Sequence, residues 1–279
     1  MFRRFINLFV YSNIFIACCA VVMTWQTYQL IIRQLPDYNL LYFVFFATIT
    51  SYSFHWYLTS HSEIPSDRIG WTNAYRYIHT ILFLIGIIGS AIFFFLLLKH
   101  WFWLFLSAII TFLYSAPKIP QKHFRALRKI AIGKTIFLAF VWMYATTILP
   151  LIISGTKWQP DSILFILSRF FLIYSICILF DYRDRKDDKA AGIRSMITYF
   201  SEKAINLLFT LSLLVFVLST LLLTMYNYSI KAIAFLLIPG FLTGILYNYG
   251  KRSPDDFFFY FILDGLMMFS ALLMIIFGI

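Results

Sequence analysis

The most regular feature of the chain is a succession of long apolar stretches that are separated by short polar segments. Apolar runs of about eighteen residues or more are typical of helices that cross a membrane. We therefore predict an all-α, polytopic membrane protein with nine transmembrane helices, folded as a single embedded domain over residues 1–279. The expected spans cover residues 5–32, 38–59, 77–98, 101–114, 130–153, 162–180, 204–225, 233–249 and 257–277.

The composition agrees with this pattern. Of the 279 residues, 61% are hydrophobic and only 13% are charged, which is more apolar surface than a soluble domain buries. The net charge of +11 raises the question of nucleic-acid binding, but the basic residues are confined to short segments between spans. Such a distribution is typical of membrane topology and of attraction to anionic lipids or substrates. We expect membrane lipids, and no nucleic acid, as partners.

The Lys and Arg residues fall mainly on one side of the predicted membrane. They cluster at the N-terminus and in the segments that follow the second, fourth, sixth and eighth spans. Each alternate segment has only one, namely Arg33, Lys99, Lys157 and Lys231. Because positive charge is retained in the cytoplasm, we predict a multi-pass membrane protein whose N-terminus and basic loops are cytoplasmic. The C-terminus is expected on the opposite side.

A dense run of charges follows the sixth span. Asp181, Asp184 and Asp188 are spaced at i, i+3 and i+7, so on a helix they share one face. Carboxylate oxygens suit Mg²⁺, which is usually held by one or two carboxylates, waters and substrate phosphates. Basic side chains that can hold phosphate oxygens are interleaved with them, namely Arg183, Arg185, Lys186, Lys189 and Arg194. The alternative interpretation is a solvated, charged loop.

A second group of polar residues closes the fourth span. Pro117 disfavours helix at the residue before it, so the span should end there, with Tyr114 and Ser115 at its cytoplasmic end. Lys118 and Lys122 begin a basic segment that can attract an anionic group. An ordinary determinant of topology has the same appearance.

Two ionisable residues lie inside predicted spans. Arg169 is in the middle of the sixth span and Asp264 is within the ninth. Charges at that depth cost a few kcal/mol or more and usually face each other or a polar interior. We expect Arg169 and Asp264 to pair with each other, with a substrate role as the alternative.

These features together resemble the UbiA superfamily of intramembrane prenyltransferases. The second aspartate-rich motif of that family, D-x-x-D-x-x-x-D followed by Gly and a basic residue, is matched by Asp181, Asp184 and Asp188 with Gly192 and Arg194. Its Tyr-Ser-x-Pro element is matched by Tyr114, Ser115 and Pro117. The resemblance implies a nine-helix bundle with its site on the cytoplasmic side.

The first aspartate-rich motif of the family, N-D-x-x-D-x-x-x-D, is absent. An ungapped placement puts Ser51, Tyr52, His55 and Thr59 at its Asn and three Asp positions. The nearest acidic residues that follow are Glu63 and Asp67, which could reach back toward the second motif. His55 is a candidate phosphate donor or proton carrier, or else a helix-end histidine that is hydrogen-bonded to a neighbour.

The resemblance implies an enzyme that ionises an allylic prenyl diphosphate with Mg²⁺ and transfers the prenyl group to an acceptor. The residues that it implies are Asp181, Asp184 and Tyr114 for catalysis, Asp181, Asp184 and Asp188 for Mg²⁺, and Lys118, Lys122, Arg183, Lys189, Arg194, Ser115 and His55 for the diphosphate. The alternatives are a terpene cyclase on the same fold and a non-catalytic isoprenoid-binding or lipid-binding homologue.

Overall fold

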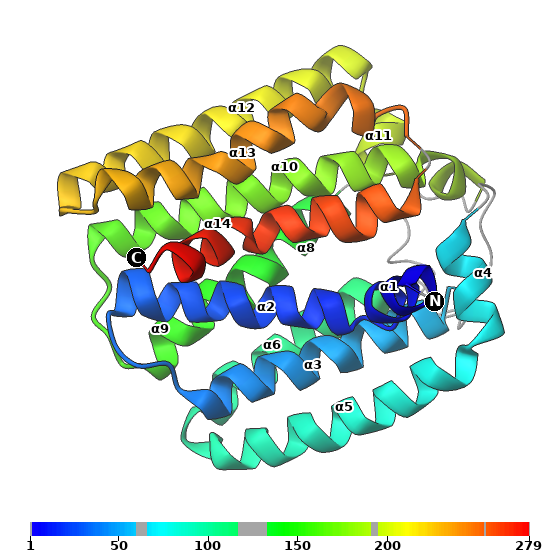
Figure 1. Cartoon of the computed structure of the whole chain (residues 1–279), viewed down its shortest axis with the longest axis horizontal. Coiled ribbons are helices and arrows are strands. Elements are labelled where there is room, and N and C mark those ends of the chain that lie inside the picture. Colours follow the sequence, from blue (N-terminus) through cyan, green and yellow to red (C-terminus); the bar gives the residue numbers. More distant parts are fainter. Residues whose placement is uncertain (1, 60–65, 117–132, 191–194, 254, 279) are drawn as a thin grey trace.

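The computed structural model describes residues 2–59, 66–116, 133–190, 195–253 and 255–278, and these residues fold as a bundle of helices (Figure 1). Long helices run side by side along one direction, as expected for an all-α membrane protein. The elements are α1 (Phe2–Tyr11), α2 (Ile14–Thr27), η1 (Tyr28–Ile32), α3 (Tyr38–Tyr57), α4 (Asp67–Ala74), α5 (Arg76–Leu96), η2 (Leu98–His100), α6 (Trp101–Ser115), α8 (Lys134–Met143), η5 (Tyr144–Ile148), α9 (Leu149–Ile153), α10 (Pro160–Ala190), α11 (Met196–Tyr199), α12 (Glu202–Leu222), η6 (Leu223–Tyr226), α13 (Ile230–Gly250), η7 (Phe258–Leu263) and α14 (Asp264–Phe277).

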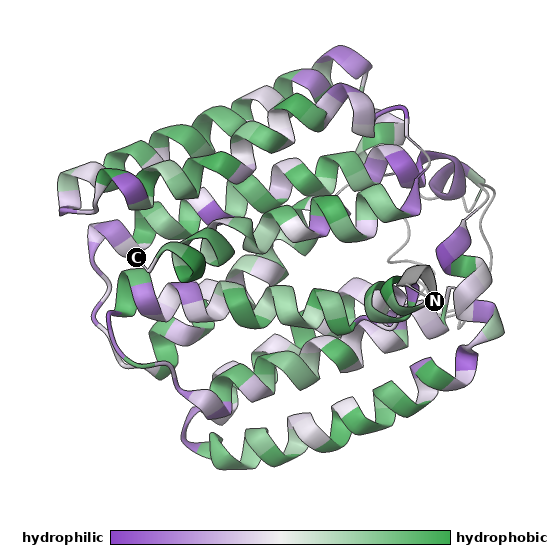
Figure 2. Cartoon of the chain, in the orientation of Figure 1, coloured by the Kyte–Doolittle hydropathy of each residue, from purple (hydrophilic) through white to green (hydrophobic). Residues whose placement is uncertain are grey.

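Eight helical segments in the described part of the chain are long and apolar enough to cross a membrane. The ninth expected span corresponds to α3, which has 20 residues but is not among the eight. Its Tyr, Ser, Thr, Asn and His side chains lower its mean hydropathy, although it is packed among the other long helices. Apolar residues cover the middle of the bundle and polar residues gather at its ends (Figure 2).

Seven helices close a ring, in which each packs on the next. The order around it is α2, α3, α6, α8, α10, α13 and α14, and α14 packs on α2 again. The two remaining long helices lie outside this ring, because α5 packs on α3 and α12 packs on α10 and α13. The outer helix α5 exposes large apolar side chains, including Ile81, Ile88 and Phe95, as a surface in contact with lipid does.

The first predicted span is interrupted. We expected one helix over residues 5–32, but the chain breaks between α1 and α2 at Asn13, whose φ of 71° is left-handed. The Asn13 side chain is buried, and its amide nitrogen is 3.4 Å from both Ser53 Oγ and His79 Nδ1. Asparagine tolerates this backbone conformation, and here the break lets its side chain join three parts of the bundle.

The sixth span is longer than predicted. It was expected to end at Phe180, but α10 continues without a break to Ala190, so the acidic run is helical. The polar segment between the second and third predicted spans likewise contains the short helix α4. Both extensions lie at the end of the bundle that also holds the N-terminus, and we call this end the site end (Figure 1). The C-terminus lies at the opposite, far end, as the predicted topology requires.

The expected pairing of Arg169 with Asp264 is wrong. The buried Arg169 guanidinium donates instead to the Met23 carbonyl at 2.8 Å, the Thr146 carbonyl at 3.1 Å and Gln26 Oε1 at 2.6 Å. Thr146 lies in η5, a π-helical turn, and such turns displace carbonyls from the regular helical pattern. Neutral acceptors from α2 and η5 therefore satisfy the arginine within the bundle.

Candidate functional site

The three aspartates of the second motif share one face of α10 near its C-terminal end. Since α10 is helical through Ala190, the predicted spacing does place them in one row. Asp181 and Asp188 are buried, whereas the Asp184 side chain is 36% exposed. Only the middle aspartate of the row is therefore partly accessible at the site end.

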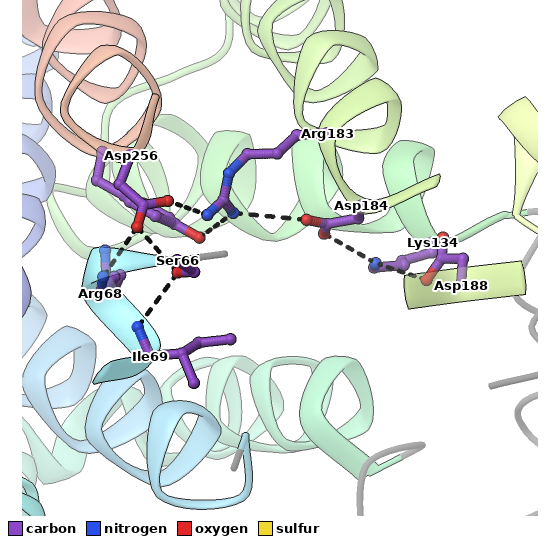
Figure 3. Close-up of polar contacts among 9 residues, drawn as sticks. Ser66, Arg68, Ile69, Lys134, Arg183, Asp184, Asp188 and Asp256 are labelled. Carbon is purple, nitrogen blue, oxygen red and sulfur yellow. Dashed lines mark hydrogen bonds and ion pairs between the residues drawn. The ribbon is translucent and has the colours of Figure 1, made fainter. Parts of the chain in front are cut away.

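Lys134, the first residue of α8, lies between two of these aspartates. Its Nζ atom is 3.6 Å from Asp184 Oδ2 and 3.8 Å from Asp188 Oδ1 (Figure 3). The Lys134 side chain is 24% exposed and that of Asp188 is 5% exposed, so water screens the Asp188 interaction only weakly. One ammonium group therefore holds two motif carboxylates together.

Thr135, the next residue, engages the third aspartate. Its hydroxyl donates to Asp181 Oδ2, and both residues are buried. The N-terminus of α8 faces α10 at this point, and a helix N-terminus stabilises a nearby negative charge. Residues 134 and 135 together provide a partner for each carboxylate in the motif.

Arg183 connects the motif to the last helix of the chain. Its guanidinium donates to Asp256 Oδ1 and to the Tyr260 hydroxyl, and Nη1 lies 3.6 Å from Asp184 Oδ1 (Figure 3). Its Cζ atom is 4.6 Å from the centre of the Tyr260 ring, which adds a cation–π contact. Asp256, Arg183, Asp184, Lys134 and Asp188 thus form a continuous chain of alternating charges.

The other oxygen of Asp256 holds the start of α4. It accepts hydrogen bonds from Ser66 Oγ and from the Arg68 backbone amide, each at 2.8 Å (Figure 3). Ser66 Oγ in turn accepts from the Ile69 amide at 3.2 Å and caps the helix. The segment that follows the missing first motif therefore reaches the second motif through Asp256 and Arg183. Asp67 lies in this turn, and Glu63 lies outside the described residues.

Arg68 is a second buried cation beside the site. Its guanidinium lies between the rings of Trp56 and Tyr260, at 4.0 and 4.1 Å from their centres, and donates to Asn13 Oδ1 at 2.6 Å. Burial lowers the pKa of the Arg68 guanidinium.

His55, Tyr114 and Ser115, all predicted to belong to the site, are brought together. His55 Nδ1 is 3.3 Å from Ser115 Oγ, and the His55 ring stacks on the Tyr114 ring with centres 5.3 Å apart. His55 is thus a helix-end histidine that is hydrogen-bonded to a neighbour, as one of its two predicted roles required. These contacts join the end of α3 to the end of α6.

The other positions that correspond to the first motif carry no acidic group. The Tyr52 hydroxyl accepts a hydrogen bond from Trp142 Nε1 at 3.2 Å, and the Thr59 hydroxyl donates to the His55 carbonyl at 2.9 Å. Ser51 is half-buried on the same helix. This end of α3 therefore presents aromatic and hydroxyl groups where the family pattern has carboxylates.

The described residues do not provide a ready metal site. Among them, no three His, Cys, Asp or Glu side chains converge as a set of ligands. The three aspartates that should bind Mg²⁺ instead contact Lys134, Arg183 and Thr135. A magnesium site at Asp181, Asp184 and Asp188 stays a prediction, and the positive charge beside these residues comes from the protein.

Some predicted residues cannot be placed. Lys118, Lys122 and Arg194 lie outside the described residues, and Lys189 is exposed on the last turn of α10. The sequence interpretation also missed Lys134, Arg68 and Asp256, which carry much of the observed network. Lys134 gave a usable signal, because it lies inside the predicted fifth span, where a charge is costly.

Comparison with known proteins now decides the family. The model of the UbiA prenyltransferase family matches residues 57–273 of this chain. The chain belongs to the UbiA prenyltransferase family. The UbiA match begins at Tyr57, just beyond most of the positions where the first aspartate-rich motif was expected.

The fold comparison agrees with this assignment. A solved structure described as a digeranylgeranylglyceryl phosphate synthase in membranes superposes with a TM-score of 0.56. It is 13% identical in sequence, and the alignment covers 98% of each chain, so the similarity in fold extends over nearly all of this chain. No curated protein sequence gives a significant match to this chain.

Proposed function

We propose that this protein is a membrane-embedded prenyltransferase that binds an isoprenoid diphosphate at the site end and transfers its prenyl group to an acceptor. The observation that carries the proposal is the row of Asp181, Asp184 and Asp188 on α10, with Lys134 and Arg183 against it. Membership of the UbiA family supports the choice of a prenyl diphosphate as substrate. The N-terminus and the site end are proposed to face the cytoplasm.

The chemistry begins with heterolysis of the allylic substrate. The bond between C1 of the prenyl group and the diphosphate oxygen breaks, and both electrons leave with the diphosphate. The ammonium of Lys134 and the guanidinium of Arg183 stabilise the negative charge that develops on the leaving group. A nucleophilic atom of the acceptor then donates an electron pair to C1, and its proton is released.

The aromatic residues next to the charged row suit the cationic fragment. Tyr114 stacks on His55 beside the carboxylates, and the Tyr52 hydroxyl lies against Trp142 on the same side of the ring of helices. Aromatic faces attract a carbocation, and an apolar environment protects it from water. We propose that Tyr114 lies nearest the reacting carbon, and that Ser115 and His55 contact the diphosphate.

The decisive experiment measures diphosphate release by the purified protein in lipid vesicles with a panel of prenyl diphosphates. The protein is assayed with and without a lipid-extract acceptor, beside Asp184→Asn and the matched control Asp37→Asn. Asp37 caps α3 at the far end, and Asn caps a helix as well as Asp does, so the control keeps activity. Asp184→Asn is expected to reduce release about 100-fold, because the neutral amide no longer holds Lys134 and Arg183, the two cations that stabilise the leaving diphosphate.

The acceptor decides between reaction types. Diphosphate release that requires the acceptor supports a prenyltransferase. Diphosphate release at the same rate with and without the acceptor indicates a terpene cyclase. If every diphosphate binds but none is cleaved, the site serves binding only, which the missing first motif would explain. If no diphosphate of the panel is bound or cleaved, the proposal is contradicted.

A further inference from the structure

We propose that Lys134 is a built-in counter-cation that replaces a metal ion between Asp184 and Asp188, so that this site binds a diphosphate without a divalent metal. The inference rests on the proposed function, because it concerns how the same site holds its substrate. It starts from a disagreement between the motif, which predicts Mg²⁺, and the contacts, which join two of its three carboxylates to one ammonium group.

The position of Lys134 is the first argument. A cation that serves two motif carboxylates at once must lie between them, and Lys134 Nζ lies 3.6 and 3.8 Å from their oxygens. A magnesium ion there would need oxygens at about 2.0–2.1 Å in near-octahedral geometry. The ammonium occupies that position, and the metal would have to displace it against its electrostatic attraction to both carboxylates.

The anchoring of Lys134 is the second argument. The lysine begins α8, and the next residue, Thr135, is buried and hydrogen-bonded to Asp181. Residues 134 and 135 are therefore held against α10 by contacts to all three carboxylates. The amine belongs to the framework of the site, unlike a long surface lysine that samples many positions.

Charge balance is the third argument. Relative to the family pattern, this chain lacks three carboxylates at the first motif, where Tyr52, His55 and Thr59 stand. The family resemblance implies two Mg²⁺ ions, which carry four positive charges. The loss of three carboxylates and the presence of one ammonium group change the net charge of the site by the same four units. The site thus has the electrostatic balance of a metal-loaded site without a metal.

Arg183 supports the same conclusion from the other side of the row. Its guanidinium pairs with Asp184 and is itself fixed by Asp256 and Tyr260. Guanidinium groups bind phosphate oxygens in a planar fork. A diphosphate that enters beside the exposed Asp184 therefore meets two fixed cations, one from α8 and one from α10.

The test measures binding directly, with two probes and no turnover. Inorganic pyrophosphate and a non-hydrolysable prenyl thiolodiphosphate are titrated calorimetrically into the vesicle-reconstituted full chain, either in EDTA or in Mg²⁺. Mn²⁺ binding is followed separately by electron paramagnetic resonance. The variants are Lys134→Met, which keeps the length of the side chain, and Lys134→Arg, which keeps the charge. Lys231→Met, an exposed lysine at the far end, controls for the change in net charge.

The wild-type protein and Lys231→Met are expected to bind both probes in EDTA, and Mg²⁺ should change the affinity less than about 3-fold. Both proteins should bind Mn²⁺ with a dissociation constant in the millimolar range or weaker. Lys134→Met is expected to bind both probes at least about 10-fold more weakly than the wild-type protein in EDTA. Its affinity for the probes should recover when Mg²⁺ is added, and it should bind Mn²⁺ more tightly than the wild-type protein does. Ten-fold corresponds to about 1.4 kcal/mol. The affinity of Lys134→Arg for both probes is expected to remain independent of metal.

The wild-type measurement tests the inference of metal-free binding even if a variant fails to fold. Wild-type binding that requires Mg²⁺, or tight Mn²⁺ binding, overturns this inference and leaves the prenyltransferase proposal standing. Failure of both probes to bind in either condition overturns the diphosphate site itself. Metal-independent binding that Lys134→Met does not weaken also contradicts the role given to Lys134.

Discussion

At the scale of single residues, Arg183 is the side chain on which the charged network depends. It is the one described residue that contacts both Asp184 of the second motif and Asp256 and Tyr260 beside the last helix. These contacts use the flat guanidinium and its separate N–H groups. An ammonium group has the same charge, but it cannot reach all three partners in the same geometry.

Replacing Arg183 by lysine therefore tests geometry apart from charge. We expect Arg183→Lys to lower kcat/KM for diphosphate release about 10-fold or more, as loss of a charged hydrogen bond of about 1.5–3 kcal/mol implies. Arg185→Lys is the matched control, because Arg185 is exposed two residues further along the same helix. Equal rates for Arg183→Lys and the wild-type protein would show that the network needs only a positive charge at this position.

At the scale of the elements, the interior of the bundle is tied together by the contacts of Arg169 with neutral groups. This side chain from α10 binds carbonyl and amide oxygens of α2 and η5, and Gln26 continues the chain of contacts to Ser270 of α14 at 3.0 Å. Opposite helices of the ring are therefore joined at this level. At the site end the ring is instead joined through charged side chains.

Arg169→Met tests whether this polar cluster stabilises the bundle. The methionine fills much of the same volume, but it removes the charged donor that the Met23 and Thr146 carbonyls and Gln26 share, and a hydrogen bond to a charged group contributes about 1.5–3 kcal/mol. We expect the midpoint of thermal unfolding in detergent to fall by about 5–10 °C, following the usual relation between free energy and midpoint. Lys157→Met, an exposed change near the start of α10, should leave the midpoint unchanged. An unchanged midpoint for Arg169→Met would contradict a stabilising role.

At the scale of the whole molecule, the functional groups gather at one end of the bundle. The second motif, the start of α8, α4 and the ends of α3 and α6 all lie there, while the C-terminus is at the far end (Figure 1). The helix α10 connects both ends, with Gln159 directly before it at the far end and Tyr199 in the following helix, α11, at the site end. The distribution of Lys and Arg predicts that the site end faces the cytoplasm.

The orientation can be measured by labelling single cysteines in cells with a membrane-impermeant maleimide. The native Cys18, Cys19 and Cys177 are free, and all three are first replaced by alanine. Gln159→Cys and Tyr199→Cys then report on the two ends, since both positions are exposed. We expect Gln159→Cys to react in intact cells and Tyr199→Cys to react only after the membrane is opened. The reverse pattern would contradict the predicted orientation.

Much of this protein could be predicted from the order of its residues. The apolar stretches determine where helices cross the membrane, because lipid accommodates their apolar side chains and a helix satisfies their backbone hydrogen bonds internally. The spacing of Asp181, Asp184 and Asp188 places them on one face of any helix that they share. These properties depend on local sequence alone, and together with Tyr114, Ser115 and Pro117 they are sufficient to indicate the UbiA family.

The partners of the charged groups were decided only by the tertiary structure. Lys134 meets Asp188 from a different helix, Asp256 is brought to Arg183 from far along the chain, and Arg169 binds neutral oxygens rather than Asp264. Sequence spacing cannot give these contacts, because they depend on which helices become neighbours when the ring closes. The sequence therefore determined the membrane fold and the acidic row, and the packing of α8 against α10 decided which cation faces that row.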